Sequence, residues 1–144
     1  MSADRDRETT SREIASLMGG LVRTFRSGFV TCADELGLAP GEAQLIWLLD
    51  ERGDASTGDL ARRMGVDPAN ASTLLSRLEG RGLVRRAPAE RDRRRRLISL
   101  TARGRRAKDD LARCVESRQP GFERLTNAEL TRFRDLLRRA AGEG

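Results

Sequence analysis

Apolar residues recur every three or four positions in the first quarter of the chain. They fall at Ile14, Leu17, Met18, Leu21, Val22, Phe25, Phe29, Ala33 and Leu36. This spacing predicts one long amphipathic helix from Ser11 to Leu36, which Gly37 ends. Residues 1–9 lack the pattern and are expected to form a disordered tail. They are polar and partly acidic, so we do not expect them to be a signal peptide.

Three shorter helices are predicted between residues 41 and 80. The first covers residues 41–51, and the second covers residues 56–64 with Ser56 as its cap. After a turn at Gly65-Val66, Asp67 caps the third helix and Pro68 takes its first position. The buried face of this third helix carries Ala71, Leu74, Leu75 and Leu78. Two short helices joined by a tight turn are typical of a helix-turn-helix.

The pattern changes to strands after Gly82. Alternating residues predict a strand at 83–87 and another at 95–100, separated by a charged loop, which together form a β-hairpin. Thr101 then caps a helix over residues 102–118. The motif Thr126-Asn-Ala-Glu129 is a capping box that begins a last helix, ending near Ala140.

The predicted fold is therefore mainly α with a small β-hairpin wing, a winged helix-turn-helix with long terminal helices. The first and last helices show more apolar face than one thin domain can cover, so we expect them to be dimerisation helices. Four segments are expected. After the tail at 1–9 come an N-terminal dimerisation helix at 10–36, a DNA-binding domain at 37–101 and C-terminal dimerisation helices at 102–144.

The amino-acid composition excludes several classes of function. The 144 residues are 38% hydrophobic and 35% charged, a balance that favours completing the core by oligomerisation. No apolar run approaches the ~18 residues that span a bilayer, so we expect a cytoplasmic protein with no membrane partner. The chain has no His, which removes the commonest catalytic base and metal ligand. We expect no enzyme activity, no metal and no cofactor. Cys32 and Cys114 lie far apart in sequence, suggest no disulfide framework, and are expected to be structural thiols.

Positive charge is concentrated in one segment. Residues 81–106 contain eleven Arg and two acidic residues, a net charge of +9, so the other 118 residues sum to −3. Such a patch on a mildly acidic body is typical of a nucleic-acid footprint. A solvated charge run and a patch for anionic lipid are the alternatives.

The candidate DNA contacts follow from the winged-helix arrangement. A slim polar helix face enters the major groove, where Asn bonds adenine and Arg bonds guanine or phosphate. The charged hairpin tip follows the backbone and can place Arg94 in the minor groove, with Asp92 bracing its guanidinium. The candidate contacts are Ser56, Thr57, Pro68, Ala69, Asn70, Ser72, Thr73, Arg77, Arg93, Arg94, Arg95 and Arg96.

Several of these segments resemble the MarR family of bacterial transcription regulators. The matching residues are Ser56 to Ala61, Val66 to Leu78 and, above all, a wing signature. In this sequence the signature is Asp92-x-Arg94, then Leu100-Thr101, then Gly104. The resemblance extends over nearly the whole chain, because the order and lengths of the predicted helices also agree.

The resemblance implies a homodimer on a pseudo-palindromic operator in double-stranded DNA, with two recognition helices roughly 34 Å apart. It also implies a repressor released by a small aromatic ligand. The candidate ligand-binding residues are Phe25, Arg26, Phe29 and Trp47. The candidate dimer interface contains Ile14, Leu17, Met18, Leu21, Phe133, Leu136 and Leu137.

Two other functions stay open. One is a redox-switched regulator that uses Cys32 or Cys114. The other is a non-specific polyanion or membrane-surface adaptor that uses the basic patch.

Overall fold

The computed structural model describes residues 2–49, 55–89, 92, 94, 96–118 and 121–142. The chain divides into two compact units. Unit 1 combines residues 1–25 with 118–144, and unit 2 is Arg26–Ser117. The predicted segment boundaries follow helix ends, whereas the boundary between these units falls inside the first helix and directly after the fifth.

Helix α1 (Ser2–Glu35) is the longest element and contributes to both units. The predicted disordered tail is wrong, because α1 already begins at Ser2. Side-chain contacts between successive turns lie along this first part of α1. Arg12 Nη2 lies 2.8 Å from Glu8 Oε1, one turn away, and the hydroxyl of Thr9 donates to the carbonyl of Arg5. The helix ends where predicted, since Gly37 adopts a positive φ of 66°.

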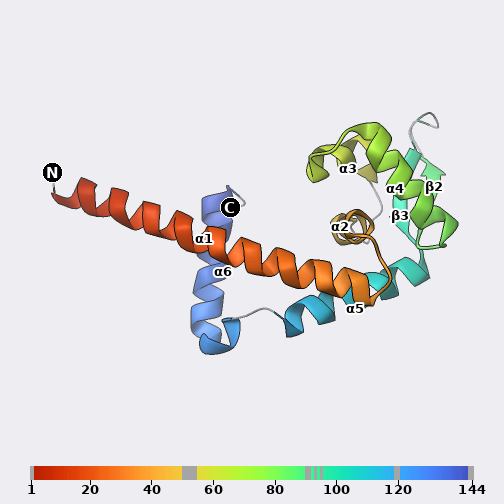
Figure 1. Ribbon diagram of the computed structural model, residues 1–144. Helices are drawn as coiled ribbons and strands as arrows, with labels where there is room; N and C mark the ends of the chain where they lie inside the picture. The colour runs from red at the N-terminus through yellow and green to blue at the C-terminus, as the bar shows by residue number, and fades with distance from the viewer. Residues whose placement is uncertain are drawn as a thin grey trace. The chain divides into compact units, whose positions relative to one another are not determined.

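Unit 2 contains the helix-turn-helix. Helices α2 (Pro40–Leu48), α3 (Thr57–Met64) and α4 (Pro68–Gly80) pack around one apolar core with the end of α1 and with α5 (Ala102–Ser117). The turn between α3 and α4 has Gly65 in the left-handed region. Leu75 and Leu78 of α4 are fully buried, and so are Leu45 and Ile46 of α2. In Figure 1, α2 is drawn between α5 and the α3–α4 pair.

The wing is a three-stranded antiparallel sheet in the order β1-β3-β2. Strands β2 (Val84–Pro88) and β3 (Arg96–Leu100) form the predicted hairpin, with Arg86 opposite Ile98. The additional strand β1 (Ala55–Ser56) was not predicted from the sequence. Two residues are too short to show an alternating pattern, and Ser56 also caps α3, so its helix signal hides its strand pairing.

Three of the contacts that hold α5 to the rest of unit 2 join it to segments far away in the sequence. Gly104 packs directly on the backbone carbonyl of Leu83, from which an added Cβ would lie only 1.9 Å away. The ammonium of Lys108, the one lysine of the sequence, donates to the carbonyl of Leu49 after the end of α2.

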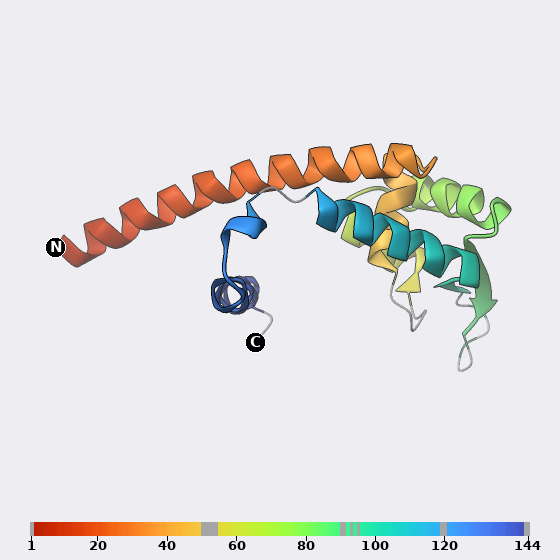
Figure 2. The same ribbon diagram turned by 90° about the horizontal axis from the view of Figure 1, so that it is seen from below.

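The third link is a disulfide between Cys32 and Cys114. It corrects the expectation that these cysteines do not pair. Their 82-residue separation gives no local signal, because tertiary packing alone brings the end of α1 beside α5, as Figures 1 and 2 show.

Unit 1 contains the first part of α1, a 3₁₀ turn η1 (Phe122–Arg124) and helix α6 (Asn127–Ala141). Thr126 caps α6, and Glu129 completes the predicted capping box. The rings of Phe122 and Phe133 pack edge to face, with centroids 6.2 Å apart. In the described part of the chain, no helix is both long and apolar enough to cross a membrane.

Candidate nucleic-acid interface

Helix α4 has two chemically distinct faces. Ala71, Leu75 and Leu78 are buried against unit 2. The opposite face is exposed and small or polar, and it contains Pro68, Ala69, Asn70, Thr73, Ser76 and Arg77. Ser72 lies between the two faces and is half-buried. A helix with slim side chains at its N-terminal end and an arginine further along fits the shape and hydrogen-bonding pattern of the major groove.

Local hydrogen bonds fix the start of α4. The carboxylate of Asp67 accepts from the backbone N–H of Asn70 at 2.9 Å, so Asp67 is the predicted cap. This bond uses the backbone of Asn70 and leaves its side-chain amide at the surface. The hydroxyl of Thr73 donates to the carbonyl of Ala69 at 3.0 Å. Its oxygen keeps acceptor capacity for a base or for water.

Arg86 of β2 holds α4 from the wing side. Its Nη2 donates to Ser76 Oγ at 3.1 Å and to the carbonyl of Ser72 at 3.3 Å. Its Nε lies 3.4 Å from Glu79 Oε2, an ion-pair distance without the geometry of a hydrogen bond. One half-buried guanidinium therefore joins the wing to two turns of the recognition helix. The sequence analysis counted Arg86 in the basic patch but did not identify this role, because the pairing depends on how the sheet packs on α4.

The wing tip carries the second group of candidate contacts. Arg94 and Arg96 are exposed, whereas Arg93 and Arg95 lie outside the described residues. Asp92 Oδ1 accepts from the backbone N–H of Arg94 at 3.0 Å. The predicted brace therefore acts on the backbone of Arg94 rather than on its guanidinium. This fixes the turn and leaves the direction of the Arg94 side chain unconstrained by that bond.

Ser56 and Thr57 lie at the start of α3 and are half-buried. The hydroxyl of Ser56 accepts from the backbone N–H of Asp59, and the carboxylate of Asp59 accepts from the backbone N–H of Ser56. Ser56 is thus engaged in a capping box. Its position still places the N-terminal end of α3 in the helix-turn-helix, where backbone N–H groups and the helix dipole favour a phosphate.

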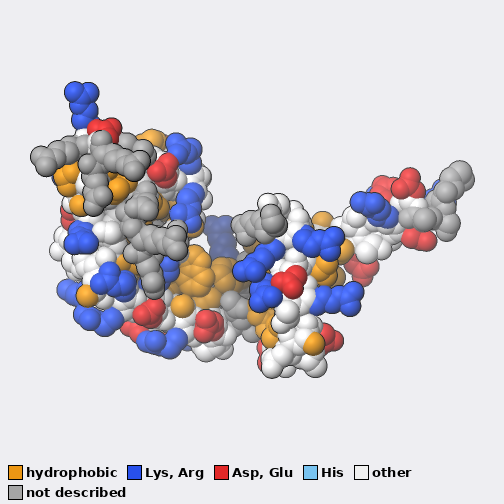
Figure 3. All heavy atoms as spheres, turned by 180° about the vertical axis from the view of Figure 1, so that it is seen from behind, with side chains coloured by type: hydrophobic (Ala, Val, Ile, Leu, Met, Phe, Trp, Pro, Cys, Tyr) orange, Lys and Arg blue, Asp and Glu red, His pale blue; other side chains and the backbone are white. Residues whose placement is uncertain are grey.

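Positive side chains are spread over unit 2 rather than confined to the wing. Figure 3 shows Lys and Arg at many points of the face that it presents. Some are already paired, such as Arg81 with the buried carboxylate of Glu42 at 3.0 Å. Among the described residues, no cluster of three or more His, Cys, Asp or Glu is placed to hold a metal ion.

The four predicted ligand-binding residues are divided between the two compact units. Phe29 and Trp47 pack edge to face, with centroids 5.6 Å apart, against the core of unit 2. Phe25 instead belongs to unit 1, where it lines an apolar cavity, and Arg26 is exposed. The spacing of apolar residues in the sequence does not show this division, because one continuous helix, α1, contributes to both units.

Together, the polar face of α4 and the arginine-bearing wing define the protein as a winged helix-turn-helix. Comparisons with known proteins agree. A family model described as MarR family matches residues 36–95. The HTH-type transcriptional regulator YcgE of Bacillus subtilis is 32% identical over 110 residues, which cover 76% of this chain and 71% of YcgE. YfiV, an HTH-type regulator from the same organism, is 32% identical over 90 residues. That alignment covers 62% of this chain and just over half of YfiV, 56%.

Solved structures share the fold over most of the chain. CouR from Rhodococcus jostii RHA1, bound to p-coumaroyl-CoA, is 28% identical with a TM-score of 0.72. The alignment covers 91% of this chain and 93% of CouR. A MarR family protein from Mycobacterium tuberculosis, in complex with p-aminosalicylic acid, is 25% identical with a TM-score of 0.69 and coverages of 88% and 97%. The chain belongs to the MarR family. It is a winged helix-turn-helix, DNA-binding transcription regulator, and the family is not enzymatic.

Proposed function

We propose that this regulator binds a pseudo-palindromic operator in double-stranded DNA as a homodimer, and that it acts in the cytoplasm as a repressor. The observation that carries the proposal is the exposed polar face of α4 beside the arginine-bearing wing. The helix supplies base-reading side chains, led by Asn70 and Arg77, and the wing supplies phosphate or minor-groove contacts through Arg94 and its neighbours. The polar, uncharged side chains on the exposed face of α4 support DNA over a general polyanion surface, since base reading needs hydrogen-bonding groups as well as charge.

The homodimer follows from the surface of unit 1. Ile14 is 51% exposed, Leu17 62% and Leu136 50%. Large apolar side chains this exposed on two helices mark an interaction surface rather than a solvated one. Leu137, the next residue of α6, is also exposed. Since unit 1 lies at both ends of the chain, a second copy that covers these faces would join two recognition helices in one particle.

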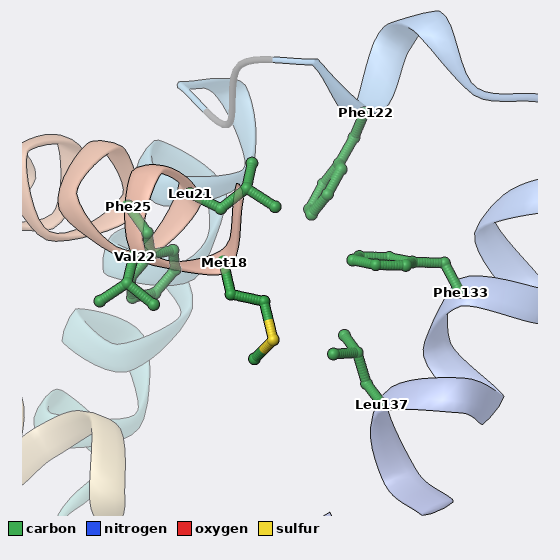
Figure 4. A pocket seen from close by; sticks show the side chains of 7 residues that line it. All are labelled: Met18, Leu21, Val22, Phe25, Phe122, Phe133 and Leu137. Atoms are coloured by element: carbon green, nitrogen blue, oxygen red, sulfur yellow. The ribbon is translucent and has the colours of Figure 1, made fainter. Parts of the chain in front are cut away.

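Unit 1 also has an apolar cavity of about 340 Å³ that is open to the surface. Side chains from α1, from η1 and from α6 point toward it, as Figure 4 shows. Its lining residues are Met18, Leu21, Val22, Phe25, Phe122, Phe133 and Leu137. A small aromatic effector that releases the DNA fits the size and character of this cavity. The relatives that bind p-coumaroyl-CoA and p-aminosalicylic acid support that class of ligand.

Fluorescence anisotropy tests the proposed function. The purified protein is titrated against the DNA upstream of its own gene and against a scrambled duplex of equal length, each at two salt concentrations. We expect tight binding to the first duplex, weak binding to the second, and a steep loss of affinity with salt from phosphate contacts. Addition of p-coumarate to the complex then tests release by an aromatic acid.

A matched pair of variants separates the reading of bases from the electrostatic attraction to phosphates. Asn70→Ala removes a base-reading side chain without changing the net charge, so it should reduce the preference for the upstream duplex by roughly 1–3 kcal/mol. Asn127→Ala on α6 makes the same chemical change outside the interface and should leave the preference intact. Equal binding of both duplexes by the unmodified protein, with strong salt sensitivity, would favour the polyanion adaptor. Comparable binding to anionic vesicles would favour it further.

A further inference from the structure

The Cys32–Cys114 disulfide crosslinks the end of α1 to α5 within unit 2. The two Cα atoms lie 5.8 Å apart, a separation that a disulfide spans without backbone movement. Cys32 is fully buried, whereas Cys114 is half-buried. Cys114 Sγ also lies 3.7 Å from Oε2 of Glu35, which is an exposed residue. A small molecule in solution therefore approaches the sulfur pair from the Cys114 side.

The position of this disulfide in the chain gives it mechanical importance. The chain passes between the two compact units after Phe25 and again after Ser117. Cys32 follows the first passage within two helical turns, and Cys114 precedes the second within one. The disulfide thus fastens together the two segments through which unit 2 is connected to unit 1.

The same segments support the recognition helix. Helix α5 packs against α2, and α2 packs against α4. Lys108 of α5 also donates to the carbonyl that follows α2. A change in how firmly α1 is held to α5 therefore acts on the framework behind the DNA-binding face and on the connections to the proposed dimerisation unit.

We propose that Cys32 and Cys114 form a reversible thiol–disulfide site that tunes operator binding. This inference rests on the proposed function, because a protein that acts on cytoplasmic DNA works in a reducing compartment. Disulfides are rare there, and those that form are usually transient, catalytic or redox-sensing. A cysteine pair at disulfide distance, with one buried and one half-buried member on two different helices, meets the geometric requirement for such a site.

The oxidant is a low-molecular-weight disulfide of the glutathione class. The Cys114 thiolate attacks one sulfur of that molecule, forms a mixed disulfide and expels one thiolate. The Cys32 thiolate then attacks Cys114 Sγ and expels the second. The protein loses two electrons and two protons, and the small disulfide takes them up as two thiols. The reverse sequence returns both protein cysteines to thiols.

The two states should differ in their response to DNA geometry. With the disulfide formed, α1 and α5 leave unit 2 in one fixed arrangement, so the spacing of the two recognition helices is held. With the thiols reduced, that constraint is lost and the dimer adapts to a wider range of half-site spacings. The oxidised protein therefore discriminates more strongly between operators of different spacing.

The experiment equilibrates the full-length protein in glutathione buffers of graded composition. The disulfide fraction is measured by alkylation and intact mass, and operator affinity by anisotropy. The duplexes are the operator and the same operator with one base pair inserted between the half-sites. We expect a reversible transition. We also expect the insertion penalty in Kd to be about fivefold or more larger for the oxidised protein, the low end of ordinary coupling between sites.

Two results would overturn the proposal: a pair that never oxidises in these buffers, or equal insertion penalties in both states. The variant Cys114→Ser changes the half-buried partner and should show the reduced-state penalty in every buffer, with thermal unfolding as the check that it folds. Because the unmodified protein is compared with itself, the conclusion does not depend on that variant. Loss of preference for the operator in both states would instead contradict the proposed function.

Discussion

Arg86 Nη2 donates a hydrogen bond to Ser76 Oγ at 3.1 Å, so the guanidinium of a residue in strand β2 is bonded to helix α4. The same group reaches the carbonyl of Ser72 and lies at ion-pair distance from Glu79. Ser76 is on the exposed face of α4 and Ser72 is at its edge. The orientation of the exposed polar face of α4 therefore depends on a residue of β2.

Arg86→Met should weaken operator binding by roughly 3- to 30-fold, the range for residues that act through a neighbour. Met keeps most of the apolar volume but cannot donate to Ser72 or Ser76. The slope of log affinity against log salt should stay unchanged, because Arg86 is used within the protein. Arg85→Met is the matched control, since Arg85 is exposed and bonds Ser99 of the next strand instead. A reduced salt slope for Arg86→Met would show that Arg86 contacts phosphate directly.

Arg94→Ala should lower both affinity and salt sensitivity. If its guanidinium neutralises one phosphate, the slope of log affinity against log salt falls by about 0.9. Arg132→Ala removes the same charge from an exposed position on α6 and should leave the slope unaltered. Titrations at four salt concentrations measure both slopes. Identical slopes for the two variants would show that Arg94 does not contact a DNA phosphate.

Gly104→Ala should destabilise unit 2. A Cβ at this position would meet the carbonyl oxygen of Leu83 at 1.9 Å, so either α5 or the backbone at Leu83 must move. We expect a loss of roughly 3 kcal/mol in the free energy of unfolding, at the upper end for overpacking. Gly80→Ala is the control. Nothing lies within 4 Å of its new Cβ, and alanine favours the helix by up to about 1 kcal/mol. Urea unfolding measures both, and equal stability of the two variants would refute the close approach.

The capping box of α6 should loosen in acid. The backbone N–H and the hydroxyl of Thr126 donate to the Glu129 carboxylate and lower the pKa of that group below its ordinary value of 4.5. Because the pKa of Glu129 is lower in the folded state than in the unfolded state, its carboxylate contributes its full stabilisation of the fold at pH values above 4.5. That contribution is lost as the pH falls through the lowered folded-state pKa. An NMR titration of the Glu129 carboxyl carbon checks the direction.

In Thr126→Ala, the pKa of Glu129 should move back toward 4.5, because the hydroxyl donor is removed and the remaining backbone donor is held less firmly. A pKa of 4.5 or above in the unmodified protein would contradict the capping geometry.

Much of the fold could be predicted from local chemistry. Asp67 and Pro68 mark the start of α4, and Thr126 with Glu129 marks the start of α6. Both helices begin where predicted, because caps and first-turn residues act over three or four positions. The two-faced character of α4 was also predictable, since helical periodicity alone separates Leu75 and Leu78 from Asn70 and Arg77.

The rest depends on contacts between distant segments. The Cys32–Cys114 disulfide, the pairing of β1 with β3 and the contact of Arg86 with Ser76 all join residues far apart in sequence. Neither periodicity nor capping rules carry information on such pairs. The assignment of Phe25 to unit 1 and Phe29 to unit 2 was equally unpredictable, because nothing in a continuous helical pattern shows where one compact unit ends and the next begins.

Selection of bound duplexes from a random DNA pool tests the central claim most directly, that two copies of this chain read one operator through α4. Sequencing should recover an inverted repeat whose half-sites lie about one helical turn apart, roughly 34 Å. The same selection with Asn70→Ala should relax one position in each half-site. Recovery of unrelated sequences with no repeated half-site, at affinities that follow salt alone, would contradict the account.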